Sequence, residues 1–178
     1  MERVVVVGCC GSGKSYVARE IGRLTGAPVT HLDAIYYDDE WNTAPMDDFA
    51  DAQRELVAAP RWVIDGNYNS TLEIRLRACD TVVFVDVPTR SCLWGMVSRQ
   101  LRHGAGQHSA NGVYNRINAG VVKYVLGYRR SMRPRVLSKV EAYAGHARVV
   151  SLRSRARARQ WLAKLADQQL REGLADLG

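Results

Sequence analysis

The octapeptide GCCGSGKS near the start of the chain has residue types and a spacing suited to binding phosphate. It fits the pattern G-x-x-x-x-G-K-[ST] and lies between the apolar run VVVV and a segment with helical periodicity. Its glycines allow consecutive backbone N–H groups to face an anion, beneath which lies the positive end of the following helix. We expect Lys14 to reach the β- and γ-phosphates and the Ser15 hydroxyl to bind Mg²⁺. The predicted nucleotide-binding residues here are Gly8, Cys9, Cys10, Gly11, Ser12, Gly13, Lys14, Ser15 and Tyr16.

Two aspartates follow later β-like runs, in HLDAIYY and WVIDGNY. Ligands of an open α/β sheet bind outside the carboxyl ends of its strands, so both side chains are expected near the phosphates. Asp33 is expected to orient or deprotonate an attacking hydroxyl; the alternative is a helix N-cap. Asp65 is expected to hold the Mg²⁺ hydration shell or contact the substrate; the alternative is a structural turn.

Aromatic residues flank both aspartates. We expect them to line a partly aromatic acceptor pocket, although aromatic clusters are at least as often part of a core. The predicted substrate-binding residues are Asp33, Tyr36, Tyr37, Trp41, Asp65, Gly66, Asn67 and Tyr68.

The cysteines and histidines predict neither a disulfide nor a metal centre. The four cysteines form no CxxC or CxxH pattern and are expected to be reduced thiols. Cys9 and Cys10 are best explained as small residues that fit a tight loop; the alternative is a redox-sensitive thiol at a helix N-terminus. His103 and His108 lack neighbouring ligands on a regular element, so metal binding is not expected there.

Short runs rich in valine and isoleucine alternate with amphipathic segments, which predicts a doubly wound parallel α/β sheet. The expected strands are 3–7, 29–32, 62–64, 81–87 and 148–152. The first and last expected helices are 13–25 and 154–170. A second helix is expected to begin at an Asp47 N-cap and to end before Pro60. A third is expected after Pro88, with an inward apolar stripe of Leu93, Met96, Val97 and Leu101. Residues 103–118 are expected to form a mobile surface loop.

The bulk composition favours one globular domain over 178 residues. The apolar runs are too short to cross a bilayer and no signal peptide precedes the first strand, so a cytoplasmic protein is expected. The net charge of +7 suits a polyanionic small ligand or a nucleic acid. The basic run RSRARAR is best explained as a solvated helix face, with an acidic partner as the alternative.

The phosphate loop, HLDAIYY, WVIDGNY, CDTVVFVDVP and the closing VVSLRS together resemble the adenylate kinase-related group called DNA topology modulation proteins. The resemblance implies a three-layer P-loop NTPase fold with a five-stranded parallel sheet of order 2-3-1-4-5. It also implies a substrate-binding helical insert around 34–60 and a helical lid around 100–130. Arg99, Arg129 and Arg130 would stabilise the transferring phosphoryl group, while Arg102 and Arg153 would contact the nucleotide.

The predicted activity is transfer of a phosphoryl group from Mg-ATP to a small molecule, most simply at a hydroxyl group. The chain departs from the group in its lid, where SANGVYNRIN reproduces a Gly-Asn-Arg-Glu-like string only loosely, with Asn115 and Arg116 standing in. The flank of the second strand also lacks an arginine pair for a nucleotide α-phosphate. This lack weakens the case for a nucleoside monophosphate kinase, which is the first alternative. The second alternative, which is not favoured, is an ATP-binding regulator that contacts DNA.

Overall fold

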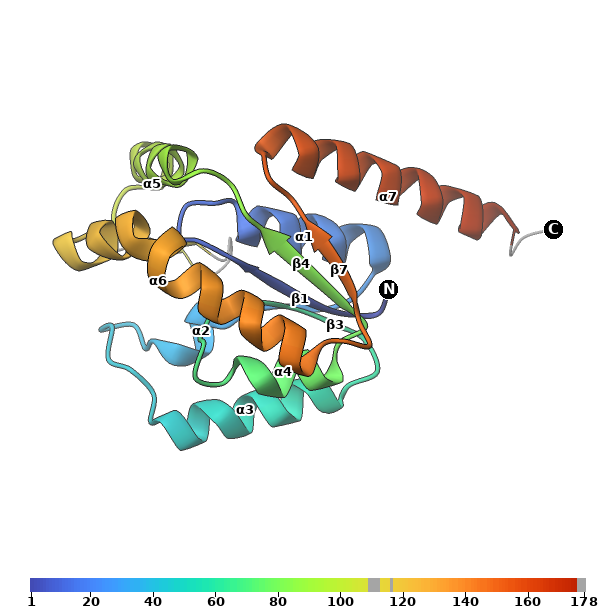
Figure 1. The fold of residues 1–178 in the computed structure, drawn as a ribbon, viewed down its shortest axis with the longest axis horizontal. Coiled ribbons are helices and arrows are strands. Elements are labelled where there is room, and N and C mark those ends of the chain that lie inside the picture. Colours follow the sequence, from blue (N-terminus) through green and yellow to red (C-terminus); the bar gives the residue numbers. More distant parts are fainter. Residues whose placement is uncertain (109–112, 116, 176–178) are drawn as a thin grey trace.

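The centre of the computed structural model, which describes residues 1–108, 113–115 and 117–175, is a five-stranded parallel sheet (Figure 1). The strands in spatial order are β2 (Val29–His31), β3 (Trp62–Asp65), β1 (Arg3–Gly8), β4 (Thr81–Val85) and β7 (Arg148–Ser151). This arrangement confirms the predicted parallel α/β class. The order differs from the predicted 2-3-1-4-5 in that the edge strand is the seventh in the chain, because two short strands precede it.

Strand β1 is buried on both faces, which explains its unbroken run of valines. Val4 and Val6 pack into the hydrophobic cluster on one side of the sheet, whereas Val5 and Val7 pack into the cluster on the other. Successive side chains of a strand point to opposite faces. A strand with both faces covered therefore has no polar alternation in its sequence.

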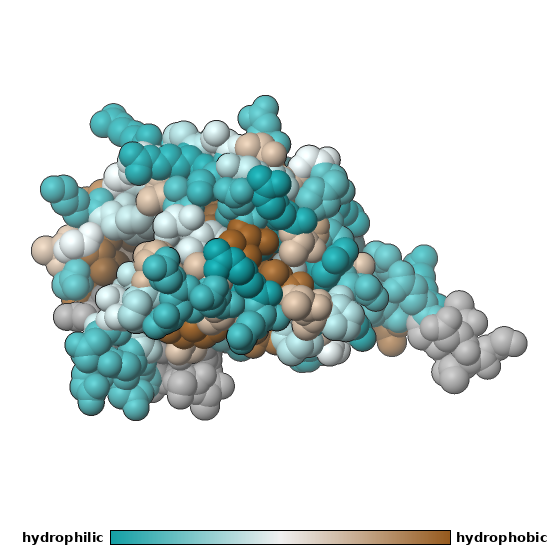
Figure 2. Space-filling model, turned by 90° about the horizontal axis from the view of Figure 1, so that it is seen from below, coloured by the Kyte–Doolittle hydropathy of each residue, from teal (hydrophilic) through white to brown (hydrophobic). Residues whose placement is uncertain are grey.

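Helices cover both faces and complete three layers (Figure 1). Helix α1 (Lys14–Thr25) packs with α7 (Arg155–Ala175) on one face. Helices α3 (Met46–Ala58), α4 (Leu72–Ala78) and the second half of α6 (Ala119–Tyr143) cover the other. The first half of α6 packs with α5 (Thr89–His103) beside the phosphate loop, and a single-turn helix, α2 (Asp33–Tyr36), follows β2. The outer surface on the α3 side is mostly hydrophilic (Figure 2).

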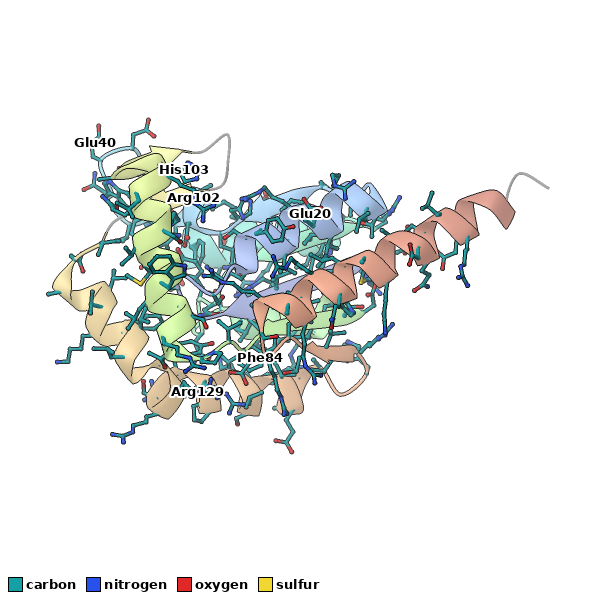
Figure 3. All side chains as sticks on the ribbon, turned by 90° about the horizontal axis from the view of Figure 1, so that it is seen from above. Glu20, Glu40, Phe84, Arg102, His103 and Arg129 are labelled. Atoms are coloured by element: carbon teal, nitrogen blue, oxygen red, sulfur yellow. The ribbon has the colours of Figure 1, made fainter. Side chains whose placement is uncertain are left out.

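Two helix predictions need correction. Helix α3 begins at Met46 after Pro45, so Asp47 lies in its first turn and is not the N-cap. In α5, Met96 is buried, but Val97 is 48% exposed and Leu101 is 78% exposed. The inward stripe is therefore narrower than predicted, and Arg102 and His103 mark the far end of the helix (Figure 3).

The segment predicted as an irregular loop contains a two-stranded antiparallel pairing. Strand β5 (Gly106–His108) pairs with β6 (Val113–Asn115). The described residues of the region 100–130 thus comprise the end of α5, the paired strands β5 and β6, and the start of α6. Arg116 and the side chain of Asn115, on which the predicted lid contacts depend, lie outside the described residues.

Across the described ranges, none of the helices combines the length and the apolar character that a membrane crossing requires.

Candidate functional site

The phosphate loop joins β1 to α1 and has the backbone geometry that an anion site needs. Gly11 and Gly13 have φ angles of 73° and 95°, in the region that favours glycine. Gly13 is the N-cap of α1, and the loop closes with a hydrogen bond from the Ser12 N–H to the Cys9 carbonyl at 3.1 Å. The unpaired N–H groups at the start of α1 therefore face the space above the loop.

Helix α5 packs directly on the backbone of this loop. A Cβ atom on Gly11 would clash with the carbonyl oxygen of Cys92, and a Cβ atom on Gly95 would clash with the carbonyl oxygen of Gly11. Two glycines thus face each other where the loop meets the helix. The sequence showed the need for glycine at Gly11, but Gly95 gave no comparable signal.

Lys14 and Asp65 form the charged centre of the site. Asp65, the last residue of β3, is 4% exposed, and its Oδ1 lies 4.0 Å from Lys14 Nζ. Burial opposes the charge of Lys14, but the carboxylates of Asp65 and Asp33 raise the pKa of Lys14 above its ordinary value. Burial likewise opposes the charge of Asp65, yet Lys14, His31 and the neighbouring Ser15 hydroxyl bring the pKa of Asp65 below its usual range. Both groups are therefore ionised at neutral pH.

The lowered pKa of Asp65 predicts a loss of stability in acid. A carboxylate whose pKa is lower in the folded state stabilises the fold above the unfolded value, about 4, and the contribution is lost as the pH falls through the folded value. We expect Asp65→Asn to flatten the pH dependence of the free energy of unfolding below about pH 4. Urea titrations between neutral and acid pH measure this. Asp51→Asn, at an exposed surface pair with Arg54, is the control and should leave the slope unchanged; an unchanged slope in Asp65→Asn would contradict the prediction.

Asp33 lies at the start of α2, directly after the N-cap residue Leu32. Its Oδ1 accepts a hydrogen bond from the Tyr68 hydroxyl at 2.6 Å. Burial and the charge of Asp33 raise the pKa of Tyr68, so this phenol remains a donor. Asp33 is also close enough to Lys14 to raise its pKa. The charges of both predicted carboxylates therefore act on the same lysine, and Asp65 is the one that pairs with it.

The turn after β3 links the phosphate loop to the aspartates. Asn67 Oδ1 accepts from the backbone N–H of Gly8 at 2.9 Å, and Asn67 Nδ2 donates to the Tyr124 hydroxyl at 3.0 Å. The fully buried Arg75 donates to the carbonyls of Gly66 at 2.6 Å and of Asn67 at 3.0 Å. The Asn67 side chain, predicted to bind substrate, thus fastens the loop to α6. Sequence reasoning missed Tyr124 because its partner is 57 residues away. It missed Arg75, which lies near its partners in the sequence, because the sequence gave no signal that this arginine is buried.

The predicted aromatic residues form one cluster beside Asp33. Ring centroids lie 4.8 Å apart for Tyr36 and Tyr68, 4.9 Å for Tyr36 and Tyr37, and 5.4 Å for Tyr37 and Trp41. Tyr36 and Tyr68 also pack on the buried Phe49, at 4.9 Å and 4.8 Å. The cluster therefore contributes to the core as well as flanking Asp33. Trp41 and Tyr68 have positive φ angles of 67° and 29°, which are uncommon for such residues.

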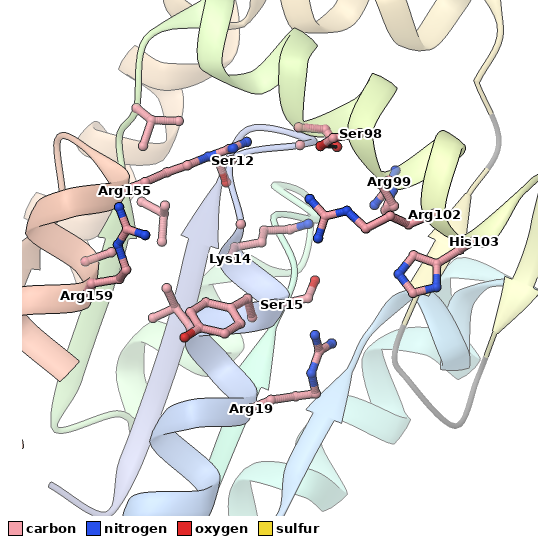
Figure 4. Close-up of a pocket in the computed structure, with 18 residues that line it drawn as sticks. Ser12, Lys14, Ser15, Arg19, Ser98, Arg99, Arg102, His103, Arg155 and Arg159 are labelled. Carbon is pink, nitrogen blue, oxygen red and sulfur yellow. Dashed lines mark hydrogen bonds between the residues drawn. The ribbon is translucent and has the colours of Figure 1, made fainter. Parts of the chain in front are cut away.

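A pocket of about 560 Å³ opens above the phosphate loop, and its lining is strongly basic (Figure 4). Lys14 lies at its centre, with the predicted Arg99 and Arg102 from α5 on one side and Arg155 and Arg159 from α7 on the other. The predicted residues in the lining are Gly11, Ser12, Gly13, Lys14, Ser15, Tyr16, Arg99 and Arg102. The lining residues with charge or hydrogen-bonding capacity that the sequence reasoning did not assign are Arg19, Ser98, His103, Arg155 and Arg159.

Three predicted arginines do not line this pocket. Arg129 Nη1 lies 3.5 Å from Asp86 Oδ1 and donates to the Val87 carbonyl at 3.4 Å. Arg130 is exposed on α6 and Arg153 is exposed before α7. The arginines of the run 153–159 that reach the pocket are Arg155 and Arg159, one helical turn apart.

Asp86, at the end of the β4 segment, is held by an arginine that the sequence reasoning missed. Arg133 Nη2 donates to Asp86 Oδ2 at 2.8 Å, and Arg133 Nε donates to both carboxylate oxygens at 3.0 Å and 3.1 Å. The hydrogen bonds with Asp86 raise the pKa of Arg133. This pair fixes α6 to the sheet beside the site.

The cysteines of the loop are free. Cys9 is buried. The pKa of its thiol is raised, mainly by the hydrogen bond with the Cys92 thiol and secondly by burial. Cys10 Sγ lies 3.8 Å from Arg99 Nη2. Within the described part of the chain, no group of three or more His, Cys, Asp or Glu side chains is arranged to hold a metal ion.

No protein-family model and no curated protein matches this chain. Solved structures do. Shikimate kinase from Acinetobacter baumannii in complex with shikimate is 17% identical, with a TM-score of 0.57 over 97% of this chain and 94% of that chain. A sugar kinase from Janibacter sp. is 15% identical, with a TM-score of 0.52 over 96% and 92%. Shikimate kinase from Bacteroides thetaiotaomicron is 15% identical, with a TM-score of 0.52 over 94% and 97%. The chain therefore has the fold of the P-loop kinases.

Proposed function

We propose that the protein is an ATP-dependent small-molecule kinase that transfers the γ-phosphoryl group of Mg-ATP to an acceptor hydroxyl. The observation that carries the proposal is the buried pair of Asp65 and Lys14, whose Oδ1 and Nζ atoms lie 4.0 Å apart, at the phosphate loop of a basic pocket. Phosphoryl transfer requires positioning and stabilisation of negative charge more than covalent chemistry by the protein. The similar solved structures, two shikimate kinases and a sugar kinase, support the same class of acceptor.

The residues present fit a magnesium ion held between the phosphates, Ser15 and Asp65. Asp65 Oδ1 is buried and has no hydrogen-bond partner among the described residues. The nearest cation, Lys14 Nζ, lies 4.0 Å from it, which is beyond hydrogen-bond distance. Mg²⁺ is a hard cation that takes oxygen ligands and keeps several of its waters. One hydroxyl and one carboxylate from the protein would therefore be enough to hold it beside two phosphates. Mg²⁺ would neutralise charge on the β- and γ-phosphates.

The protein's own groups then have separable tasks. The loop amides and Lys14 bind the β- and γ-phosphates, and Arg99 and Arg102 reach the pocket from α5 to stabilise transferred charge. Asp33 accepts the proton of the acceptor hydroxyl or orients it, with Tyr68 holding its other oxygen. Arg155 and Arg159 contact the nucleotide in place of Arg153.

We further propose that the chain belongs to the adenylate kinase-related DNA topology modulation group, as one domain with an acceptor-binding insert at 34–60 and a lid at 100–130. The order of its motifs supports this. A contribution of Arg129 to the transition state would require it to leave Asp86, and one of Arg130 would require the lid to close.

A library of hydroxyl compounds and nucleoside monophosphates, screened by ADP release, tests the activity. We expect ADP formation to depend on one class of hydroxyl acceptor. Rapid ADP formation only with a nucleoside monophosphate would replace the proposal with the adenylate-type alternative. No acceptor-dependent turnover together with DNA binding that weakens steeply with salt would favour the DNA-associated regulator.

Asp33→Asn tests the role of the acceptor carboxylate. We expect turnover with the identified acceptor to fall about 10²-fold, because a general base contributes on that order, while the Kd of Mg-ATP stays unchanged. Steady-state kinetics and calorimetry measure the two quantities. Asp167→Asn, exposed on α7 and outside the proposed insert and lid, is the control. Loss of ATP binding in a folded Asp33→Asn protein would instead place Asp33 in the nucleotide site.

A further inference from the structure

His31 is a partly buried side chain at the site to which the proposed function gives no task. It is the last residue of β2, its side chain is 13% exposed, and it lies in register with Asp65 of the neighbouring strand β3. Its Nδ1 lies 2.8 Å from Asp65 Oδ2. The pair therefore joins the two strand ends that carry the carboxylates of the site.

This contact divides the two oxygens of Asp65 between different partners. Oδ2 is engaged by His31, whereas Oδ1 lies on the side of Lys14 Nζ, 4.0 Å away, with no hydrogen-bond partner among the described residues. An ionised carboxylate only accepts hydrogen bonds, so His31 Nδ1 is the donor. Nδ1 carries a proton both in one neutral tautomer and in the imidazolium. The hydrogen bond to Asp65 can therefore form whether or not the His31 ring is charged.

A buried carboxylate can rotate unless a neighbour holds it. With His31 removed, Asp65 would be free to turn either oxygen toward Lys14, and the free oxygen would lose its fixed direction. Groups that hold a metal ligand in place in this way typically affect metal affinity about 10- to 100-fold.

We propose that His31 is a positioning residue for Asp65: its Nδ1–H holds Oδ2 so that Oδ1 faces the space beside Lys14 and Ser15, where Mg²⁺ accompanies ATP. This inference rests on the proposed function, because it requires Mg-ATP at the phosphate loop. It assigns a role that neither the loop motif nor the aspartates suggest.

Calorimetric titration of ATP in Mg²⁺ and in EDTA tests the inference without an acceptor. We compare the wild type, His31→Leu, and His31→Asn, whose amide can donate from the place of Nδ1. The ratio of the Kd of ATP in EDTA to its Kd in Mg²⁺ measures the gain in affinity that Mg²⁺ provides. We expect this ratio to be about tenfold smaller for His31→Leu than for the wild type, while the Kd in EDTA stays unchanged. We expect His31→Asn to recover most of the loss. His146→Leu is the matched control, because His146 Nε2 lies 2.9 Å from the Cys79 carbonyl, away from the site.

The outcomes separate this inference from the proposed function. Equal losses of affinity in Mg²⁺ and in EDTA would show a merely structural role and overturn the inference, as would Mg²⁺-dependent binding by His31→Leu equal to that of the wild type. A failure of the folded wild type to bind ATP in either solution would overturn the proposed function and this inference with it. If His31→Leu does not fold, failure of folded His31→Asn to retain most of the Mg²⁺-dependent gain overturns the inference.

Discussion

Replacement of Lys14 by alanine is expected to lower turnover about 10³-fold and to weaken ATP binding while the fold is retained. The ammonium group is the cation at the centre of the pocket, and preorganised charge in a water-poor site is worth on the order of 10²–10³ in rate for a single donor. Because Asp65 and Asp33 raise the pKa of Lys14, the group is fully charged across the physiological range. Its loss removes one full positive charge from the site that would bind the phosphates.

Steady-state kinetics and ATP calorimetry measure the effect, with circular dichroism to establish folding. Lys14→Met tests the same charge while keeping most of the buried stem. Lys164→Ala, exposed on α7, changes the net charge equally and should leave activity unaltered. Undiminished ATP consumption by Lys14→Ala would contradict the assignment of the phosphate loop.

Arg75→Met is expected to lower the free energy of unfolding by about 3 kcal/mol, the largest effect on stability that we predict. Arg75 has no exposed surface, burial lowers the pKa of its guanidinium to about 9, and its two hydrogen bonds go to the carbonyls of Gly66 and Asn67. Hydrogen bonds to a charged group are worth about 1.5–3 kcal/mol, and their loss leaves two carbonyls without a donor. The relief of a desolvated charge offsets part of this cost.

Urea denaturation provides the measurement. Arg77→Met is the matched control on the same helix, because Arg77 is exposed; it pairs at the surface with Glu73 and lies 4.7 Å from the centroid of the Tyr143 ring. We expect it to change the free energy of unfolding by less than about 1 kcal/mol. An Arg75→Met protein as stable as the wild type would show that the turn after β3 holds its shape without the guanidinium.

The parts of the site that the sequence revealed are those encoded locally. The phosphate loop needs only consecutive residues, and Asp33 and Asp65 each follow a run of strand residues. In contrast, Arg133 and Asp86 are 47 residues apart, so their pairing depends on how α6 returns to the sheet. Such long-range contacts leave no periodic signal.

Errors in the helices have a similar cause. Periodicity gives the spacing of apolar side chains but not where a helix leaves its neighbours, so Leu101 was assigned to an inward stripe although it is exposed. In the basic run 153–159, the resemblance implied a nucleotide contact for Arg153, whereas the arginines that line the pocket are Arg155 and Arg159 on α7. One turn of helix brings the latter two to the same wall of the pocket.

The contact between Gly11 and Gly95 has a mechanical consequence. With no side chain between them, the loop and α5 touch backbone to backbone and have no compressible layer that could absorb a displacement. A tilt of α5 would therefore move the amides of the loop, and an anion bound by those amides would in turn displace α5. Arg99 and Arg102 belong to that helix, so a displacement of α5 would shift the loop amides and these two arginines together.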